Sequence, residues 1–311
     1  MSAAGPPQGA NWPCRRRRCE TQRLLLPSMP AQAGMEPRHS APSGASASVG
    51  VHSGVYVESV GKGPPLVLIH GWAMHSGLFA PLLPRLVGDY RVHLVDLPGH
   101  GRSATVSPYA LDTVAAAVLE AVARAAGSAE PATVLGWSLG GAVAMHLALN
   151  SAERVARVVL VATTPCFVAR SGWPHAMAET TLRRFGNELT GSYRLTLQRF
   201  IALQVQGSDH ARAVLSRLRV QLFAHGEPSA EALHDALELL VRTDMRAEVA
   251  AISQPAVVIA GGRDMLVPAA ASEALARMLP HASFELIPGA AHAPFLSHPD
   301  AFMSAFADAR R

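Results

Sequence analysis

Residues 132–149, with the sequence ATVLGWSLGGAVAMHLAL, are the stretch that decides the fold. A short apolar run leads into the pattern Gly-x-Ser-x-Gly, and a helical pattern follows it. This order is typical of a nucleophile elbow, in which a sharp strand-to-helix turn holds a serine in a strained backbone conformation. Gly136 and Gly140 leave room for the strand and the helix to approach each other. We therefore predict that Ser138 is a nucleophile at the head of a helix, and the alternative is an ordinary glycine-rich helix start.

The rest of the folded part alternates short apolar runs with longer helical patterns. We predict strands at 65–69, 91–95, 132–135, 155–161, 256–260 and 283–287. We predict helices at 78–87, 111–125, 140–149, 269–279 and 294–309. Continuously apolar strands suit a parallel sheet that helices cover on both faces, so the alternation indicates an α/β fold with a mostly parallel sheet. Residues 55–60 are predicted to add an antiparallel strand at the edge of this sheet.

The alternation stops between residues 164 and 250. This stretch has four helical patterns and no convincing strand. The patterns lie at 177–189, 193–205, 210–223 and 230–240. We interpret the stretch as a helical cap inserted over the carboxyl edge of the sheet, where open α/β sheets bind ligands. The predicted domains are a disordered extension at 1–50, a core formed by 51–163 and 251–311, and the cap at 164–250.

A serine nucleophile needs a base, and the base needs an acid that orients it. In this kind of fold the acid and then the base follow the serine in the chain, on loops after later strands. Asp264 and His292 each follow one of the last two predicted strands. We therefore predict that Ser138, His292 and Asp264 form a catalytic triad.

Other acids and histidines fit these roles less well. Asp244 is a distant second candidate for the acid, and Asp96 lies in a loop that we interpret as structural. His298 lies inside a helical pattern and is expected at the surface or in packing. Four further histidines precede or accompany the nucleophile, which the order of the motif disfavours: His70, His93, His100 and His146.

The reaction also needs N–H donors that stabilise the oxyanion of the transition state. The predicted strand 65–69 runs into His70-Gly71-Trp72. This loop can aim the backbone N–H of Trp72 at the same point as the N–H of Leu139, the residue after the nucleophile. His70 and Gly71 would shape the loop, and their plainer role is to form a turn.

The composition excludes several classes of protein. The chain has 311 residues, of which 49% are hydrophobic and 16% are charged, so it can bury a large core and is not disordered as a whole. It has no apolar run of about eighteen residues, which excludes a transmembrane helix. Its three cysteines suit neither a disulfide framework nor a zinc site, so a reduced, cytoplasmic protein is expected.

The net charge of +4 is unevenly distributed along the chain. Residues 1–50 contain six arginines and two acidic residues, residues 165–226 contain eight arginines and three acidic residues, and residues 227–311 contain six arginines and eleven acidic residues. Arg15 to Arg18 alone suggest nucleic-acid or membrane binding. We favour a solvated or untranslated extension, with Met29 or Met35 as the true start. The basic segment of the folded part is most of the predicted cap.

With these motifs the sequence resembles the α/β-hydrolase family over nearly all of residues 54–311. More narrowly, it is similar to the esterases of biotin synthesis that act on pimeloyl-acyl carrier protein. The resemblance rests on His-Gly-Trp at 70–72, Asp-Leu-Pro-Gly-His-Gly at 96–101, Gly-Trp-Ser-Leu-Gly-Gly at 136–141, Trp-Pro at 173–174, Arg-Phe-Ile-Ala-Leu-Gln at 199–204, Asp264 with Leu-Val-Pro at 266–268, and Ala-His-Ala-Pro-Phe at 291–295. The tryptophan of the elbow and the stretch 200–204 are the more specific signals.

The resemblance implies hydrolysis of the methyl ester of pimeloyl carried on acyl carrier protein, which gives methanol and a free carboxylate. Ser138 would attack the ester carbonyl, His292 would take its proton, and Asp264 would hold the imidazole. By the same resemblance the acyl site would be lined by Trp72, Leu139, Phe200 and Gln204. No metal or organic cofactor is expected.

The basic segment favours the same partner independently. Acyl carrier proteins are strongly acidic, and a complementary basic surface speeds and orients docking. The candidate docking residues are Arg183, Arg184, Arg194, Arg199, Arg212, Arg217 and Arg219. A solvated helical surface is the alternative for part of this set. We expect a monomer that takes carrier-linked and small esters and binds neither nucleic acid nor a membrane.

Other functions stay open on the sequence alone. A general carboxylesterase for short acyl esters shares every catalytic feature, and the triad does not exclude cleavage of a carbon–carbon bond. Haloalkane dehalogenases and epoxide hydrolases use aspartate at the nucleophile position, so Ser138 argues against both. A ligand-binding receptor on a hydrolase scaffold is the alternative from a different class of protein.

Overall fold

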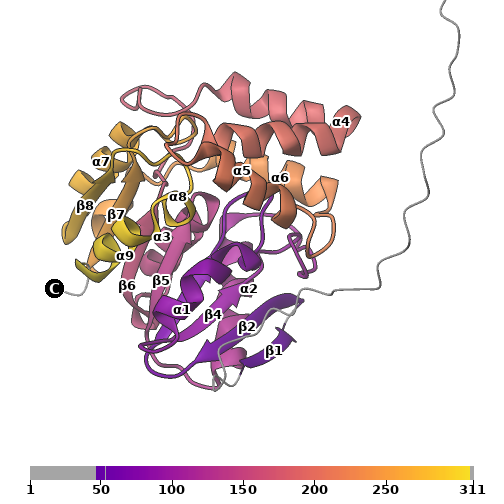
Figure 1. Ribbon diagram of the computed structural model, residues 1–311. Helices are drawn as coiled ribbons and strands as arrows, with labels where there is room; N and C mark the ends of the chain where they lie inside the picture. The colour runs from indigo at the N-terminus through magenta and orange to yellow at the C-terminus, as the bar shows by residue number, and fades with distance from the viewer. Residues whose placement is uncertain (1–46, 53, 309–311) are drawn as a thin grey trace, which may run out of the picture. The chain divides into compact units, whose positions relative to one another are not determined.

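The computed structural model describes residues 47–52 and 54–308 (Figure 1). Most of the predicted extension lies outside the described residues, including Arg15 to Arg18 and the two alternative start methionines. Strand β1, Ala47–His52, begins within the stretch that was predicted to be disordered. It pairs with the next strand through its backbone and has no continuous apolar run, so its hydrophobic pattern gave no signal.

Within the described residues, eight strands form one sheet in the order β1-β2-β4-β3-β5-β6-β7-β8. After β1 these are β2 (Val55–Gly61), β3 (Pro65–Ile69), β4 (Arg91–Val95), β5 (Ala132–Trp137), β6 (Val155–Val161), β7 (Ala256–Gly261) and β8 (Ala282–Ile287). The strands from β3 to β8 pair in parallel, so the predicted α/β fold with a mostly parallel sheet is confirmed. The predicted edge position of the 55–60 strand is wrong, because β2 lies between β1 and β4 and runs antiparallel to both.

Helices and 3-10 turns connect the strands. They are η1 (Ser76–Leu82), α1 (Leu83–Leu86), α2 (Leu111–Ala126), α3 (Leu139–Asn150), η2 (Ala152–Arg154), α4 (Glu179–Val205), α5 (Ala211–Gln221), α6 (Ala230–Arg242), η3 (Val249–Ala251), α7 (Ala269–Met278), α8 (Pro294–Ser297) and α9 (Pro299–Asp308). Two of the predicted helices, at 78–87 and 294–309, are each divided in two. A proline lies at the start of the second element in both cases, Pro84 in α1 and Pro299 in α9, and proline cannot donate a hydrogen bond to the preceding turn.

The chain inserts α4, α5 and α6 between the neighbouring parallel strands β6 and β7, and residues 164–250 are called the helical insertion below. The three helices lie together across one end of the sheet (Figure 1). The helices predicted at 177–189 and 193–205 are the two arms of α4. They meet at Ser192, whose φ of −146° and ψ of 50° are not helical.

The core is built on the central strands and the helices that flank them. Strands β3 and β7 are buried at every residue, as continuously apolar runs predict for a sheet covered on both faces. Helix α2 packs against α3, and α7 packs against β7 and β8. Arg85 of α1 pairs with Asp300 of α9 at 2.6 Å. In the part of the chain that the structure describes, no helix combines the length and the apolar character needed to cross a membrane.

Candidate active site

Ser138 occupies the sharp turn between β5 and α3. Its φ of 56° and ψ of −116° lie where residues with side chains are rare, a conformation that costs about 1–3 kcal/mol. A Cβ at Gly136 would overlap the carbonyl of Gly140, and a Cβ at Gly140 would overlap the carbonyl of Ile69. Both positions therefore require glycine, and the strand, turn and helix meet as the sequence pattern predicts.

Two hydrogen bonds hold this turn against β6 and the loop that follows it. The N–H of Ser138 donates to the carbonyl of Val161 at 2.9 Å, and the hydroxyl of Thr163 donates to the carbonyl of Ser138 at 2.8 Å. Both bonds use backbone atoms of Ser138, so they fix the turn and leave the serine hydroxyl available for chemistry.

His292 and Asp264 form a buried pair on the loops after β8 and β7. His292 Nδ1 lies 2.7 Å from Asp264 Oδ2, and both side chains are almost fully shielded from solvent. The other carboxylate oxygen, Oδ1, accepts the backbone N–H groups of Leu266 at 2.8 Å and Val267 at 3.0 Å. With Oδ1 held by two donors, Oδ2 is the acceptor for Nδ1–H. The neutral imidazole therefore keeps its proton on Nδ1 and presents an unprotonated Nε2.

Ser138 and His292 line the same small cavity. The structure shows no direct hydrogen bond between the two side chains, a looseness that is common in the absence of substrate. Trp137, the residue before the nucleophile, donates its indole N–H to the carbonyl of His292 at 2.7 Å. Its ring also lies against the imidazole, with 5.5 Å between centroids. The elbow and the loop of the base are therefore braced against each other.

The predicted oxyanion donors lie on two neighbouring elements. Leu139 is the first residue of α3, so its N–H has no acceptor within the helix. Trp72 follows β3 in a loop that His70 holds in place: His70 Nδ1 lies 2.8 Å from the carbonyl of Gly71, and His70 Nε2 accepts the N–H of Leu97 at 2.9 Å. Burial lowers the pKa of His70 to about 3, so the ring stays neutral and keeps both bonds. The donor roles of Trp72 and Leu139 stay a prediction.

The helical insertion contributes two of the predicted acyl-site residues. Phe200 packs edge-on against Trp72, with 4.6 Å between ring centroids, and lines the cavity with it. Gln204 is buried, and its side-chain amide has no hydrogen-bond partner within the described residues. Its backbone carbonyl accepts the N–H of His292 at 3.0 Å. The indole N–H of Trp72 also reaches the insertion, donating to the carbonyl of Leu233 at 2.8 Å.

Most of the cavity wall was not named from the sequence. It consists of apolar side chains from the insertion and from the loop after Asp264, namely Phe167, Met177, Leu182, Leu237, Leu240, Leu266 and Val267. Leu182, Leu237 and Leu240 lie on the apolar sides of α4 and α6, a signal that equally describes packing residues, and Leu266 and Val267 belong to the motif quoted after Asp264. Among the described residues that line this cavity, none is a lysine or an arginine.

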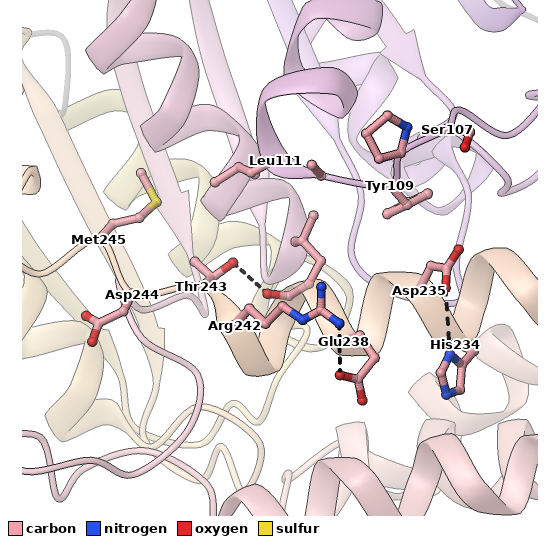
Figure 2. Close-up of a pocket in the computed structure, with 13 residues that line it drawn as sticks. Ser107, Tyr109, Leu111, His234, Asp235, Glu238, Arg242, Thr243, Asp244 and Met245 are labelled. Carbon is pink, nitrogen blue, oxygen red and sulfur yellow. Dashed lines mark hydrogen bonds and ion pairs between the residues drawn. The ribbon is translucent and has the colours of Figure 1, made fainter.

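A larger hollow lies elsewhere in the described part of the chain. It measures about 770 Å³ and lies between α6 and the residues that precede and begin α2 (Figure 2). Its rim carries Asp235, Glu238 and Arg242, and Tyr109 lies across from them (Figure 2). None of the three triad residues reaches it, so size does not identify the reactive site.

The two rejected acids, Asp244 and Asp96, have other partners. Asp244 pairs with Arg246 at 2.7 Å, and Asp96 accepts the N–H groups of Ser76 at 2.7 Å and Arg102 at 2.9 Å. These bonds give Asp96 the loop-holding role that we predicted, and leave Asp264 as the acid in contact with His292.

One group of side chains has the ligand types of a metal site. Ligand atoms of His75, Asp96 and His225 lie within 4.8 Å of one another. They already form a hydrogen-bonded network, in which Arg102 donates to His225 at 2.7 Å and His75 Nε2 lies 2.6 Å from the carbonyl of Gln221. Burial, together with His75 and Arg102, lowers the pKa of His225 to about 4. The Arg102 guanidinium thus supplies the positive charge of this group. The group as a whole joins the core to the end of α5.

The candidate docking arginines fall into two sets. On α4, Arg183 pairs with Glu179 and Glu238, Arg184 and Arg199 pair with Glu188, and Arg194 pairs with Glu227. On α5, no described acidic side chain pairs with the exposed Arg212, Arg217 or Arg219. The positive charge that is free for a partner is therefore concentrated on α5.

The chain is similar to several known proteins. A family model described as alpha/beta hydrolase fold matches residues 64–299. A pimeloyl-[acyl-carrier protein] methyl ester esterase of Xanthomonas oryzae pv. oryzae is 48% identical over 247 residues, which are 79% of this chain and 94% of that protein. The protein of that name from Nitrosomonas europaea is 42% identical over 81% of this chain and 98% of its own length. The crystal structure of a hydrolase from Pseudomonas aeruginosa, 27% identical, covers 86% of this chain and 99% of that chain with a TM-score of 0.71.

Proposed function

Since the chain belongs to the α/β-hydrolase family, we propose that it is a serine esterase that hydrolyses the methyl ester of pimeloyl-acyl carrier protein in biotin synthesis. The observation that carries the proposal is the buried pair of His292 and Asp264, in which His292 shares an apolar cavity with Ser138. An ester is uncharged, so it enters such a cavity without the large cost of burying an ion.

The reaction follows from the roles of the three side chains. The Ser138 hydroxyl attacks the ester carbonyl while His292 Nε2 takes its proton, and Asp264 stabilises the imidazolium that forms. The N–H groups of Trp72 and Leu139 stabilise the oxyanion. The intermediate then breaks its bond to the methoxy group, which leaves as methanol with the proton from His292. Water activated by His292 attacks the acyl-enzyme and releases the carboxylic acid and Ser138.

The apolar wall also promotes release of the product. Hydrolysis converts a neutral ester into a carboxylate at neutral pH, because a carboxyl group of this kind has a pKa of about 4. The cavity lining contains no lysine or arginine among the described residues, so the new charge has no cation to pair with. A buried, unpaired carboxylate is costly, and the product is therefore expelled.

The helical insertion acts, in this proposal, as a cap that completes the acyl site. It supplies Phe200, which lines the cavity, and Gln204, which is not among the lining residues but has a buried amide without a described partner. We propose that this amide binds a polar group of the acyl chain. Because the cap closes over Ser138, the acyl chain enters between the insertion and the core while the carrier protein stays outside.

We expect the purified protein to hydrolyse the carrier-linked methyl ester far more efficiently than free dimethyl pimelate. Mass spectrometry of the carrier follows the loss of the methyl group, and the gene should restore biotin-independent growth to a strain without this esterase. The Ser138→Ala variant is the negative control. Equal efficiency on both esters would favour the general carboxylesterase instead, and growth with the alanine variant would contradict the serine mechanism.

The partner proposed for the basic surface is the acidic acyl carrier protein. Arg212, Arg217 and Arg219 of α5 are exposed and carry charge that no described acidic side chain neutralises. Acidic helices of a carrier would meet this surface with complementary charge, which accelerates association and fixes orientation. The α4 arginines contribute less, because each shares its charge with a glutamate.

A double variant that reverses two α5 charges, Arg212→Glu with Arg219→Glu, should raise the KM for carrier-linked ester about tenfold. The KM for p-nitrophenyl acetate should stay unchanged, because only the carrier needs the basic surface. The control reverses Arg124 and Arg277, which lie on α2 and α7 of the core and, unlike the α5 arginines, each pair with a glutamate. An equal rise in KM for both substrates, or an equal effect of the control, would count against docking on α5. Added salt should reduce the difference between the variant and the wild type.

The proposed function also bears on location and assembly. We propose that the protein acts as a monomer, because Ser138, Asp264 and His292 can come together within one chain. The sequence has only three cysteines, which do not suit a disulfide framework, and this fits a reducing compartment. We therefore propose a cytoplasmic monomer that meets its carrier there.

A further inference from the structure

The end of α4 and the turn after it contact both loops that carry the acid and the base. The carbonyl of Gln204, in the last turn of α4, accepts the backbone N–H of His292 at 3.0 Å. Five residues later, the backbone N–H of Asp209 donates to the carbonyl of Gly289 at 3.1 Å. Gly289 lies three residues before His292, so this part of the insertion holds the base loop at two points.

The Asp209 side chain reaches the other loop. Its Oδ1 accepts a hydrogen bond from the guanidinium of Arg263 at 2.6 Å, and Arg263 directly precedes Asp264. The same guanidinium nitrogen donates to the carbonyl of Gly207 at 2.8 Å. The backbone N–H of Arg263 in turn donates to the carbonyl of Ala290 at 2.9 Å, so the acid loop and the base loop are also joined to each other.

The carboxylate fits closely against the base loop. A Cβ at Gly289 would overlap Asp209 Oδ2, and it would lie 2.9 Å from His298 Nε2. His298 Nε2 and Asp209 Oδ2 are 4.0 Å apart, so both side chains enclose this glycine. Asp209 therefore occupies the space of a side chain at position 289 and blocks one direction in which the base loop can move.

We propose that Asp209 is a positioning residue, which sets the relative placement of Asp264 and His292 through Arg263 and Gly289. The ion pair with Arg263 is half exposed, so its contribution to stability is small. Its effect is on geometry, because a displacement of about 1 Å at reacting groups can cost about 100-fold in rate. The inference rests on the proposed serine hydrolase chemistry but not on the identity of the physiological ester.

The test uses the full-length chain and p-nitrophenyl acetate, which needs no carrier. Asp209→Ala should lower kcat about tenfold with KM unchanged within about twofold, because the substrate-binding wall is intact while the acid and base lose alignment. Asp209→Asn keeps an acceptor for Arg263 and should recover most of this loss. The matched control is Glu227→Ala, which removes another exposed insertion–arginine ion pair and should leave kcat unchanged.

Two double variants test whether Asp209 acts through its contacts with Arg263 and Gly289. In an Arg263→Met background, Asp209→Ala should cause little further loss, because the two residues act through one contact. Gly289→Ala should lower kcat by its overlap with the carboxylate, and Asp209→Ala in the same chain should restore part of that activity. Thermal unfolding of each variant verifies that it is folded.

The proposal would be overturned by an unchanged kcat in Asp209→Ala, by additive losses with Arg263→Met, or by a comparable loss in Glu227→Ala. A loss that follows the melting temperature across all the variants would also overturn it. These outcomes can be distinguished from a refutation of the proposed substrate. An enzyme that cleaves p-nitrophenyl acetate but not the carrier-linked methyl ester would refute that substrate and leave the Asp209 measurements valid.

Discussion

Replacement of Ser138 by alanine should lower kcat for ester hydrolysis by about 10⁴- to 10⁶-fold, because no acyl-enzyme can form without the hydroxyl. The fold should persist. The turn is fixed by the N–H and the carbonyl of Ser138, which alanine keeps, and alanine has a Cβ like serine at the same φ of 56°. Initial rates with p-nitrophenyl acetate and with carrier-linked methyl ester measure the effect.

A fluorophosphonate probe provides an independent measurement on the same protein. It should label the wild type at Ser138 and fail to label the alanine variant. Ser151, at the other end of α3, is the matched control, and its replacement by alanine should leave both rate and labelling unchanged. Labelling of a different residue, or substantial activity in Ser138→Ala, would show that the elbow does not carry the nucleophile.

Replacement of Asp264 by asparagine should lower kcat by about 10⁴-fold although it changes a single atom of the side chain. The two N–H groups of Leu266 and Val267 require an oxygen at the Oδ1 position. The asparagine NH2 group must then face His292, where it donates instead of accepting. The imidazole consequently carries its proton on Nε2 and can no longer take the proton of Ser138.

The kinetic signature separates this loss from a loss of binding. KM for a small ester should change little, because Asp264 is not among the residues that line the cavity. Asp244→Asn is the control, since Asp244 pairs with Arg246 and is the other acid that the sequence suggested. If Asp244→Asn instead caused the large loss, the assignment of the acid would be wrong.

The fold and its reactive loops were predictable because their signals are local. Strand β3 has the predicted bounds, since it is a continuous apolar run of the kind that a buried parallel strand requires. Strand β6 also has the predicted bounds, and only Arg157 interrupts its apolar run. Ser138, Asp264 and His292 each follow a strand of the parallel part of the sheet, namely β5, β7 and β8. The carboxyl ends of parallel strands meet at one edge of a sheet, so residues far apart in the chain were expected to meet there.

The remaining features depend on contacts that the local sequence does not encode. Strand β1 forms through backbone pairing with β2, and the cavity wall forms where the insertion meets the core. The arginines of α4 form ion pairs of two kinds, those that the local sequence indicates and those that depend on the fold. The pairs of Arg183 with Glu179 and of Arg184 with Glu188 have a spacing of four residues and were visible in the sequence, whereas Arg194 with Glu227 joins distant segments.

The hydrogen bond from Trp72 to Leu233 limits how the helical insertion can be exchanged between α/β-hydrolases. The same residue has an indole that holds the insertion and an amide that we propose as an oxyanion donor, and the carbonyl of Gln204 accepts the N–H of His292, the proposed base. The insertion is therefore not an interchangeable module. A graft that replaces residues 164–250 with those of a distant relative would bring new substrate contacts, but it would also remove supports of the reaction centre. Exchange of whole insertions should succeed only when these few supports are carried over with it.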